Sequence, residues 1–217
     1  MMRSKSVLKL LSILLGVALL SSCAKPSKLY VADKNDGVFF ATPSGWYHIS
    51  QLALGHLEST SSAVGAAERA ASVLWQEAVT PKATYTATDV LSLKTPDQPI
   101  VYGRVRSLLP DEVNSISYNS LRDLILPVTS WANGTIKSPL FDISNDEEYI
   151  QKGGRGVHTV FQFTGSDGSS QTVNQTSVLS NDHTTIYVLI IRCSTSCYNK
   201  QKVALEKIAT SFTVRGK

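Results

Sequence analysis

The sequence predicts an α+β protein in which helices cover an antiparallel β-sheet. The first observation is the C-terminal third, where residues 156–163, 171–179 and 184–192 alternate or run apolar between the turn sequences TGSDGSS and SNDH. This pattern is typical of an antiparallel meander of three strands. The second observation is the amphipathic segment at 197–212, and the third is the mixture of strand-like and helix-like patterns before the meander. Together they favour helices packed on an antiparallel sheet.

The first residues have the features of a bacterial lipoprotein signal peptide. Three basic residues precede an apolar run at 10–20, which is too short to span a bilayer core of about 30 Å. The next residues, Leu-Ser-Ser-Cys, match the lipobox, in which the cysteine becomes the acylated N-terminus. We therefore expect a signal peptide at 1–22 and a lipid anchor on Cys23, which would hold the protein on the extracytoplasmic face of the cell membrane. An ordinary signal peptide with a chance cysteine is the alternative.

Removal of this leader would leave one domain of nearly neutral charge. We expect a polar tether at 23–36 and a single α+β domain at 37–217, long enough for one sizeable core. Three of the 21 basic side chains lie in the leader, which leaves 18 against 17 acidic ones. No run of basic residues is interleaved with aromatics. The charge pattern therefore argues against a nucleic-acid partner.

The first half of the domain predicts strands with one long helix between them. We expect a buried strand at 38–41, a turn at 43–45 and a second strand at 46–49. Alanines spaced by three and four predict a helix over 62–79, ended by Pro81. Residues 99–108 then alternate as a strand.

The segments around this strand give weaker patterns. Residues 84–93 are ambiguous and are expected to be extended. A helical pattern begins at Asn114 and stops at Pro127, and a loop with an Asn-Gly turn is expected at 131–142. Asn145 is expected to cap a short helix whose acidic first turn would suit the helix dipole.

Three stretches of the chain resemble a known set of proteins. These are DGVFFATPSGW, SYNSLRDLILPVTSW and IYVLIIRCSTSCYNKQKVALEKIATSFTVRG. They are similar to a family of uncharacterised actinobacterial lipoproteins with a PsbP/Mog1-like fold, over nearly all of residues 36–216. The resemblance implies an α/β/α sandwich and a binding or assembly role rather than catalysis. It carries over no catalytic or ligand residue.

Cys193 and Cys197 are the two cysteines that remain besides Cys23. They lie at the end of the last meander strand and the start of the last helix. Outside the cytoplasm such a pair is expected to form a structural disulfide. A redox-active pair and a metal site are the alternatives, although the C-x-x-x-C spacing is one residue longer than the oxidoreductase motif.

No catalytic or metal motif is found. The four histidines are not part of a nucleophile elbow or a zinc-binding helix, so we predict no catalytic residues, no cofactor and no metal. The acidic group at 142–148 lacks the alternating oxygens of a calcium loop. The sequence therefore favours a protein that is not an enzyme.

Trp131 is the candidate contact residue, because it lies in a stretch rich in Ser, Thr and Gly. Trp75 and Trp46 are expected in the core. The first functional hypothesis is a non-catalytic, lipid-anchored binding or assembly factor of the cell envelope, which contacts another envelope protein or a lipid. The alternative is a carrier or chaperone for a lipid or glycolipid with an apolar pocket between sheet and helices.

Overall fold

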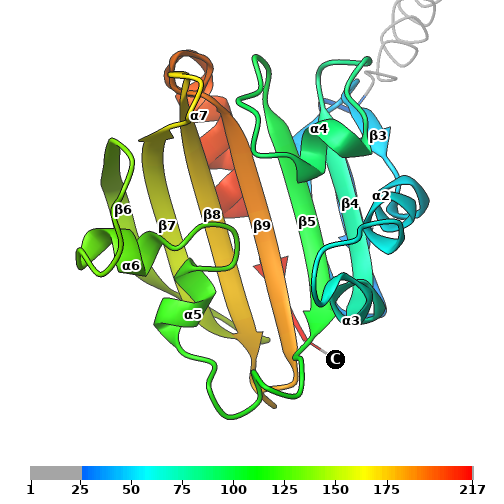
Figure 1. Ribbon diagram of the computed structural model, residues 1–217. Coiled ribbons are helices and arrows are strands. Elements are labelled where there is room, and N and C mark those ends of the chain that lie inside the picture. The colour runs from blue at the N-terminus through cyan, green and yellow to red at the C-terminus, as the bar shows by residue number, and fades with distance from the viewer. Residues whose placement is uncertain (1–25, 217) are drawn as a thin grey trace, which may run out of the picture.

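The computed structural model describes residues 26–216 and contains two antiparallel sheets with helices packed against them (Figure 1). The expected signal peptide, the acylated Cys23 and the start of the tether lie outside the described residues. The arrangement of strands and helices confirms the predicted α+β class. The large sheet has seven strands, in the order β3 (Tyr47–Ile49), β4 (Val73–Thr80), β5 (Ile100–Ser107), β9 (Thr185–Ser194), β8 (Ser170–Ser180), β7 (Gly154–Thr164) and β6 (Phe141–Gln151).

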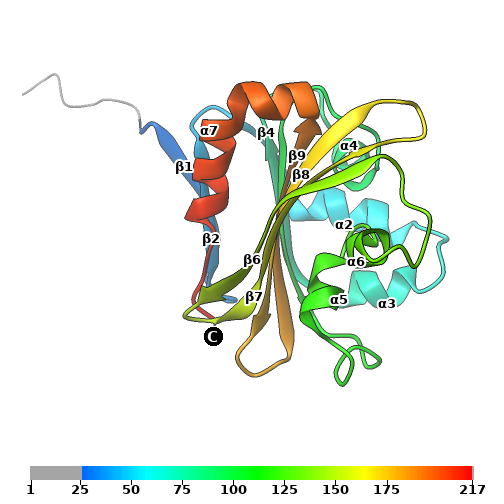
Figure 2. The ribbon, with the colours of Figure 1, turned by 90° about the vertical axis from the view of Figure 1, so that its left-hand side faces the viewer.

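The two faces of the large sheet are covered differently (Figure 2). One face packs against α7 (Thr195–Ser211) and against a small sheet made of β1 (Lys28–Asp33), β2 (Val38–Pro43) and β10 (Thr213–Val214). The opposite face carries only short helices. They are α2 (Gln51–Ser59), α3 (Ala66–Ala71), α4 (Ala87–Leu91), α5 (Tyr118–Arg122) and α6 (Val128–Ala132).

The C-terminal third folds as predicted. Strands β7, β8 and β9 form the meander, and α7 follows directly. The hydroxyl of Ser194 accepts a hydrogen bond from the backbone N–H of Cys197 and so caps the start of this helix. Leu205 and Ile208 on the buried side of α7 pack into the core. Burial of this apolar face on the sheet is the main reason for its stability.

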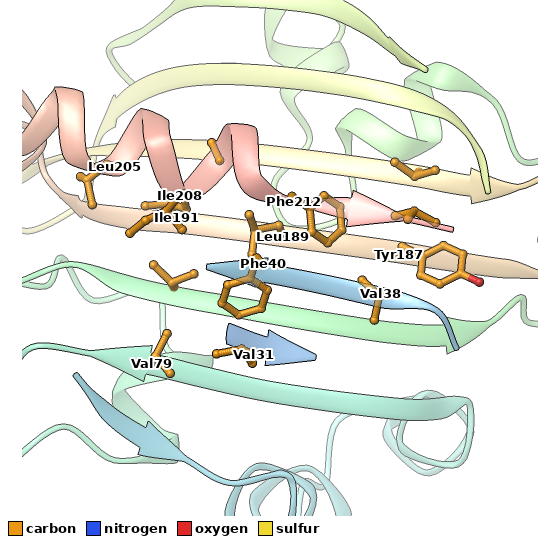
Figure 3. Close-up of a cluster of buried hydrophobic side chains, with 14 of the residues drawn as sticks. Val31, Val38, Phe40, Val79, Tyr187, Leu189, Ile191, Leu205, Ile208 and Phe212 are labelled. Atoms are coloured by element: carbon orange, nitrogen blue, oxygen red, sulfur yellow. The ribbon is translucent and has the colours of Figure 1, made fainter. Parts of the chain in front are cut away.

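The small sheet is attached to the large one by close packing around Phe40. This side chain of β2 is fully buried and points into the same layer as Leu189 and Phe212 (Figure 3). Gly103 of β5 makes room for it, because a β-carbon there would lie 2.8 Å from Cε1 of Phe40 and 2.9 Å from Cζ3 of Trp75. Trp75 is buried, as predicted. Residue 103 must therefore be glycine for the two sheets to pack at this distance.

The prediction of a helix over residues 62–79 is wrong. Residues 66–71 do form α3, but residues 73–80 form β4, a strand that pairs with both β3 and β5. Val73, Trp75 and Val79 have side chains that pack well on a sheet, and this tertiary context outweighs the helical spacing of the alanines. Helix α2, capped by Ser50, was not predicted at all.

Four further local predictions need correction. Residues 87–91, expected to be extended, form α4, and the helix expected from Asn114 to Pro127 is reduced to α5. The loop expected at 131–142 overlaps the end of α6 and the start of β6. The helix expected after Asn145 is instead the middle of β6, because an edge strand can keep acidic side chains on its solvent side.

Part of the predicted tether is folded. Residues 28–33 form β1, which pairs antiparallel with β2 from Lys28 opposite Pro43 to Asp33 opposite Val38. Val31 of this strand is buried in the core. Apolar burial and a full ladder of backbone hydrogen bonds therefore hold a segment whose polar composition predicted a linker.

Replacement of Gly103 by alanine is expected to lower the free energy of unfolding by about 2 kcal/mol, because the added methyl group overpacks the layer around Phe40. Gly55→Ala is the matched control. Its β-carbon would meet nothing nearer than 3.9 Å, and alanine in the interior of α2 should stabilise by about 0.5–1 kcal/mol. Urea unfolding measures both variants. Equal stability of the two variants would contradict the packing described here.

Candidate ligand-binding cavity

A partly open cavity of about 820 Å³ lies between the large sheet and the helical side of the molecule. Its walls come from α4, from α5 and from the segments that follow these helices, which lie over the sheet in the view of Figure 1. The volume falls in the range of roughly 300–1,000 Å³ that is usual for small-molecule sites. The apolar residues that line it are Val90, Leu91, Leu93, Ile100, Leu109, Leu124, Ile125, Leu126, Phe163, Val173, Val188 and Ile190.

Strands β5 and β9 form the floor of the cavity. Side chains two positions apart on a strand share a face, and the lining residues follow this rule. Those of β5 are Ile100, Tyr102, Arg104 and Arg106, and those of β9 are Val188, Ile190 and Arg192. In the paired strands Arg192 is opposite Ile100, and Arg104 is opposite Val188. At about 3.3 Å per residue, the floor extends roughly 20 Å from Ile100 to Arg106, with an apolar centre and arginines toward both ends.

Arg192 is a buried cation that holds one wall of the cavity. Its side chain is 7% exposed. The guanidinium donates hydrogen bonds to the backbone carbonyls of Asp89, Val90, Ser92 and Lys94, at 2.6–3.1 Å. Burial lowers the pKa of Arg192 to about 10. Within the described part of the chain, no carboxylate lies within ion-pair distance of this group.

Arg104, on the floor of the cavity, belongs to a buried polar network that reaches α2. Its Nη1 donates to Oε1 of Glu58 at 2.5 Å and to the hydroxyl of Tyr102 at 3.2 Å. That hydroxyl donates in turn to Oε1 of Gln76 at 2.6 Å, and Nε2 of Gln76 donates to Oε2 of Glu58 at 2.9 Å. Burial raises the pKa of Tyr102 to about 12. The network fixes the end of α2 to strands β4 and β5.

Arg106 holds the loop that follows β5. Its two terminal nitrogens pair with both carboxylate oxygens of Glu112, at 2.6 and 2.7 Å. Oε2 of Glu112 also accepts a hydrogen bond from the backbone N–H of Leu109 at 2.8 Å. Burial acts to raise the pKa of Glu112, but the hydrogen bonds from Arg106 and Leu109 outweigh it and hold this pKa below its usual value.

The predicted cysteine pair lies away from the cavity, at the junction of β9 and α7. Cys193 and Cys197 are both buried and are present as free thiols in hydrogen-bond contact with each other. This contact and burial raise the pKa of Cys193, whereas the same contact lowers the pKa of Cys197. The two side chains are therefore adjacent, and the disulfide stays a prediction.

The predicted contact residue Trp131 is half-buried rather than fully exposed. It lies in α6, with its ring centroid 5.3 Å from that of Phe141 and 5.9 Å from that of Phe163. It packs against the buried residues on the helical side of the sheet. Trp131 therefore supports the fold of this side, and its role as a contact residue stays a prediction.

His158 belongs to a polar chain across the other face of the sheet. Its Nδ1 lies 3.0 Å from Oε1 of Glu147, and its Nε2 lies 3.0 Å from Oδ1 of Asn174. Nδ2 of Asn174 donates to the hydroxyl of Tyr198 on α7 at 2.9 Å. These contacts connect β6, β7, β8 and α7. Within residues 26–216, no three side chains of His, Cys, Asp or Glu are grouped so that they could hold a metal ion.

The residues of the cavity were not predicted from the sequence. The strand at 99–108 was predicted, and its face with Val101, Gly103 and Val105 packs against the core. The opposite face is the one that carries Tyr102 and Arg104 into the cavity. The alternation of apolar residues and arginines in β5 was the available signal, but it does not reveal that β9 is the neighbouring strand.

Comparison with protein-family models and with curated proteins finds no match. Solved structures similar to this chain include LpqN of Mycobacterium tuberculosis, described as involved in cell envelope biogenesis, at 13% identity and a TM-score of 0.47 over 86% of this chain and 90% of that one. Another is the cyanobacterial PsbP of Synechocystis sp. PCC 6803, at 13% identity and a TM-score of 0.48, over 90% of this chain and 99% of that one. A third is the Ran-binding protein Mog1p of Saccharomyces cerevisiae, at 10% identity and a TM-score of 0.44, over 87% of this chain and 96% of that one. Proteins of both kinds named in the fold resemblance, PsbP and Mog1, are thus among the matches.

The structure predicts that Arg192→Met destabilises the protein by about 3 kcal/mol. The methionine fills a similar volume but leaves the carbonyls between Asp89 and Lys94 without their buried donor. Arg155→Met, at an exposed position of β7, is the control and should change stability by less than about 0.5 kcal/mol. The measurement is urea unfolding at pH 7. An Arg192→Met variant as stable as the control would show that these bonds do not hold the wall.

The ion pair of Arg106 and Glu112 predicts a dependence of stability on pH. Because the pKa of Glu112 is lower in the folded state, its contribution is present above the unfolded pKa and is lost as the pH falls through the folded value. Glu112→Gln should therefore destabilise at pH 7, and the difference from the wild type should shrink as the pH falls below about 4. Unfolding free energies at several pH values test this. A difference that stays constant with pH would contradict it.

Proposed function

We propose that this protein is a lipid-anchored, extracytoplasmic binding factor that carries a lipid or glycolipid in its cavity. The observation that supports the proposal is the cavity of about 820 Å³ with the apolar residues Ile100, Val188 and Ile190 on its floor. Burial of an acyl chain on such a surface contributes about 0.8 kcal/mol per CH₂ group. The arginines toward the two ends of the floor would meet the polar parts of such an amphiphile.

The anchor on Cys23 is part of the same proposal and rests on the lipobox of the sequence. Between residues 26 and 216, no helix is both long and apolar enough to cross a membrane. An acylated Cys23 would attach the protein to the membrane.

Direct lipid binding tests the carrier function. The full chain with Cys23→Ser, which removes the proposed acylation site, is titrated without detergent with a fluorescent phospholipid. We expect saturable binding that is weakened at least tenfold by Ile190→Trp, because the indole fills the floor of the cavity. Val203→Trp, at an exposed position of α7, is the matched control and should bind like the parent chain.

Circular dichroism checks that Ile190→Trp is folded. If it is not, Leu124→Trp fills the cavity from a less buried wall position. Absence of binding by the parent chain, or equal binding by the cavity variants, contradicts the carrier function. It would favour an assembly factor that binds another envelope protein, for which crosslinking in intact cells is the next measurement.

A further inference from the structure

We propose that the end of the cavity marked by Leu93 faces the bilayer that holds the anchor, and that lipid enters and leaves the cavity there. This inference rests on the proposed function and adds the orientation of the site. Leu93 lines the cavity and is nevertheless 60% exposed, so it lies at the rim. Its carbonyl accepts a hydrogen bond from Nε2 of Gln171 at 3.0 Å, which fixes this part of the rim to β8.

The folded β1 keeps the tether short. The strand begins at Lys28, five residues after Cys23. Five residues span at most about 18 Å when fully extended. The start of β1 must therefore remain within this distance of an acyl chain on Cys23. A tether that continued to residue 36, as the sequence predicted, would have left the domain free to turn away from the membrane.

The start of β1 and the rim at Leu93 belong to the same end of the molecule. Lys28 is paired with Pro43, and the chain then reaches Tyr47, which is paired with Thr80 at the end of β4. The segment that follows Thr80 leads into α4 and Leu93. Figure 2 likewise places the start of β1 and α4 toward the same end of the sheet.

The exposed side chains at this end suit a membrane surface. Tyr47 is 52% exposed and Leu93 is 60% exposed. Lys28 and Lys94 are exposed as well, and Lys82 is paired with Asp97. Tyrosine and leucine enter the interfacial region of a bilayer, while lysines reach its headgroups. A bilayer therefore fits this end of the domain as the occupant.

Depth-dependent fluorescence quenching tests the orientation. The full acylated chain with Leu93→Cys is labelled with an environment-sensitive dye and placed in vesicles of phosphatidylethanolamine and phosphatidylglycerol that contain a spin-labelled phospholipid. Val113→Cys is the matched control, because Val113 is 52% exposed and lies in the loop after β5, at the opposite end of that strand. The native Cys193 and Cys197 are buried, and the parent chain gives the background signal.

We expect at least twofold stronger quenching at position 93 than at position 113. Equal quenching at the two positions, or stronger quenching at position 113, overturns the orientation.

The rate at which a fluorescent phospholipid is transferred from vesicles to the protein gives a second readout. Leu93→Asp should slow this transfer at least tenfold, and Val113→Asp should leave it unchanged. Equal transfer rates for the two variants would overturn the entry of lipid at this rim. Lipid binding by the unanchored Cys23→Ser chain is measured without a bilayer. A failure of the carrier function is therefore distinguished from a failure of the proposed orientation.

Discussion

The central strands of the large sheet are buried on both faces, and this constraint determines the rest of the structure. In β9, nine of ten residues are buried. The face toward α7 is filled by one helix of 17 residues and by the small sheet, which together bury a continuous apolar core. The opposite face is covered by helices of five to nine residues. These short helices also bury an apolar cluster, which includes Leu54, Leu121 and Ile186, but they leave a cavity over part of the sheet.

The walls of the cavity depend on polar contacts to the floor. Arg192 binds the carbonyls of the segment around α4, Arg104 binds Glu58 at the end of α2, and Arg106 binds Glu112 in the loop after β5. Each arginine points to the cavity face because successive side chains of a strand point to opposite faces of the sheet. Burial makes these bonds costly to break, since a guanidinium or carbonyl without a partner loses its solvation. The segment around α4 and the loop after β5 are therefore fixed to the floor at defined points, and α2 is fixed to the sheet beside them.

The sequence allowed prediction of the elements whose local pattern agrees with their tertiary environment. The meander, α7 and the strand at 99–108 belong to this group. The helix at 62–79 fails because Trp75 and Val79 gain more from a central strand than the neighbouring alanines gain from a helix. Strand β1 fails because only its pairing with β2 reveals that Val31 is buried. An apolar pocket between sheet and helices was one hypothesis from the sequence, but its residues could not be predicted. They depend on the register that places Arg192 opposite Ile100 and on the short helices that cover that face.

The strands β5 and β9 are shared by the core and the cavity, so the packing of one face positions the other. Alternate residues such as Val105 and Leu189 are packed in the core, while their neighbours Arg104 and Ile190 form the floor. The close packing around Gly103 and Phe40 therefore also fixes the floor in position. Two of the wall segments are attached to this floor, the one around α4 by Arg192 and the loop after β5 by Arg106. The packing around Phe40 therefore also sets the positions from which these two walls are held.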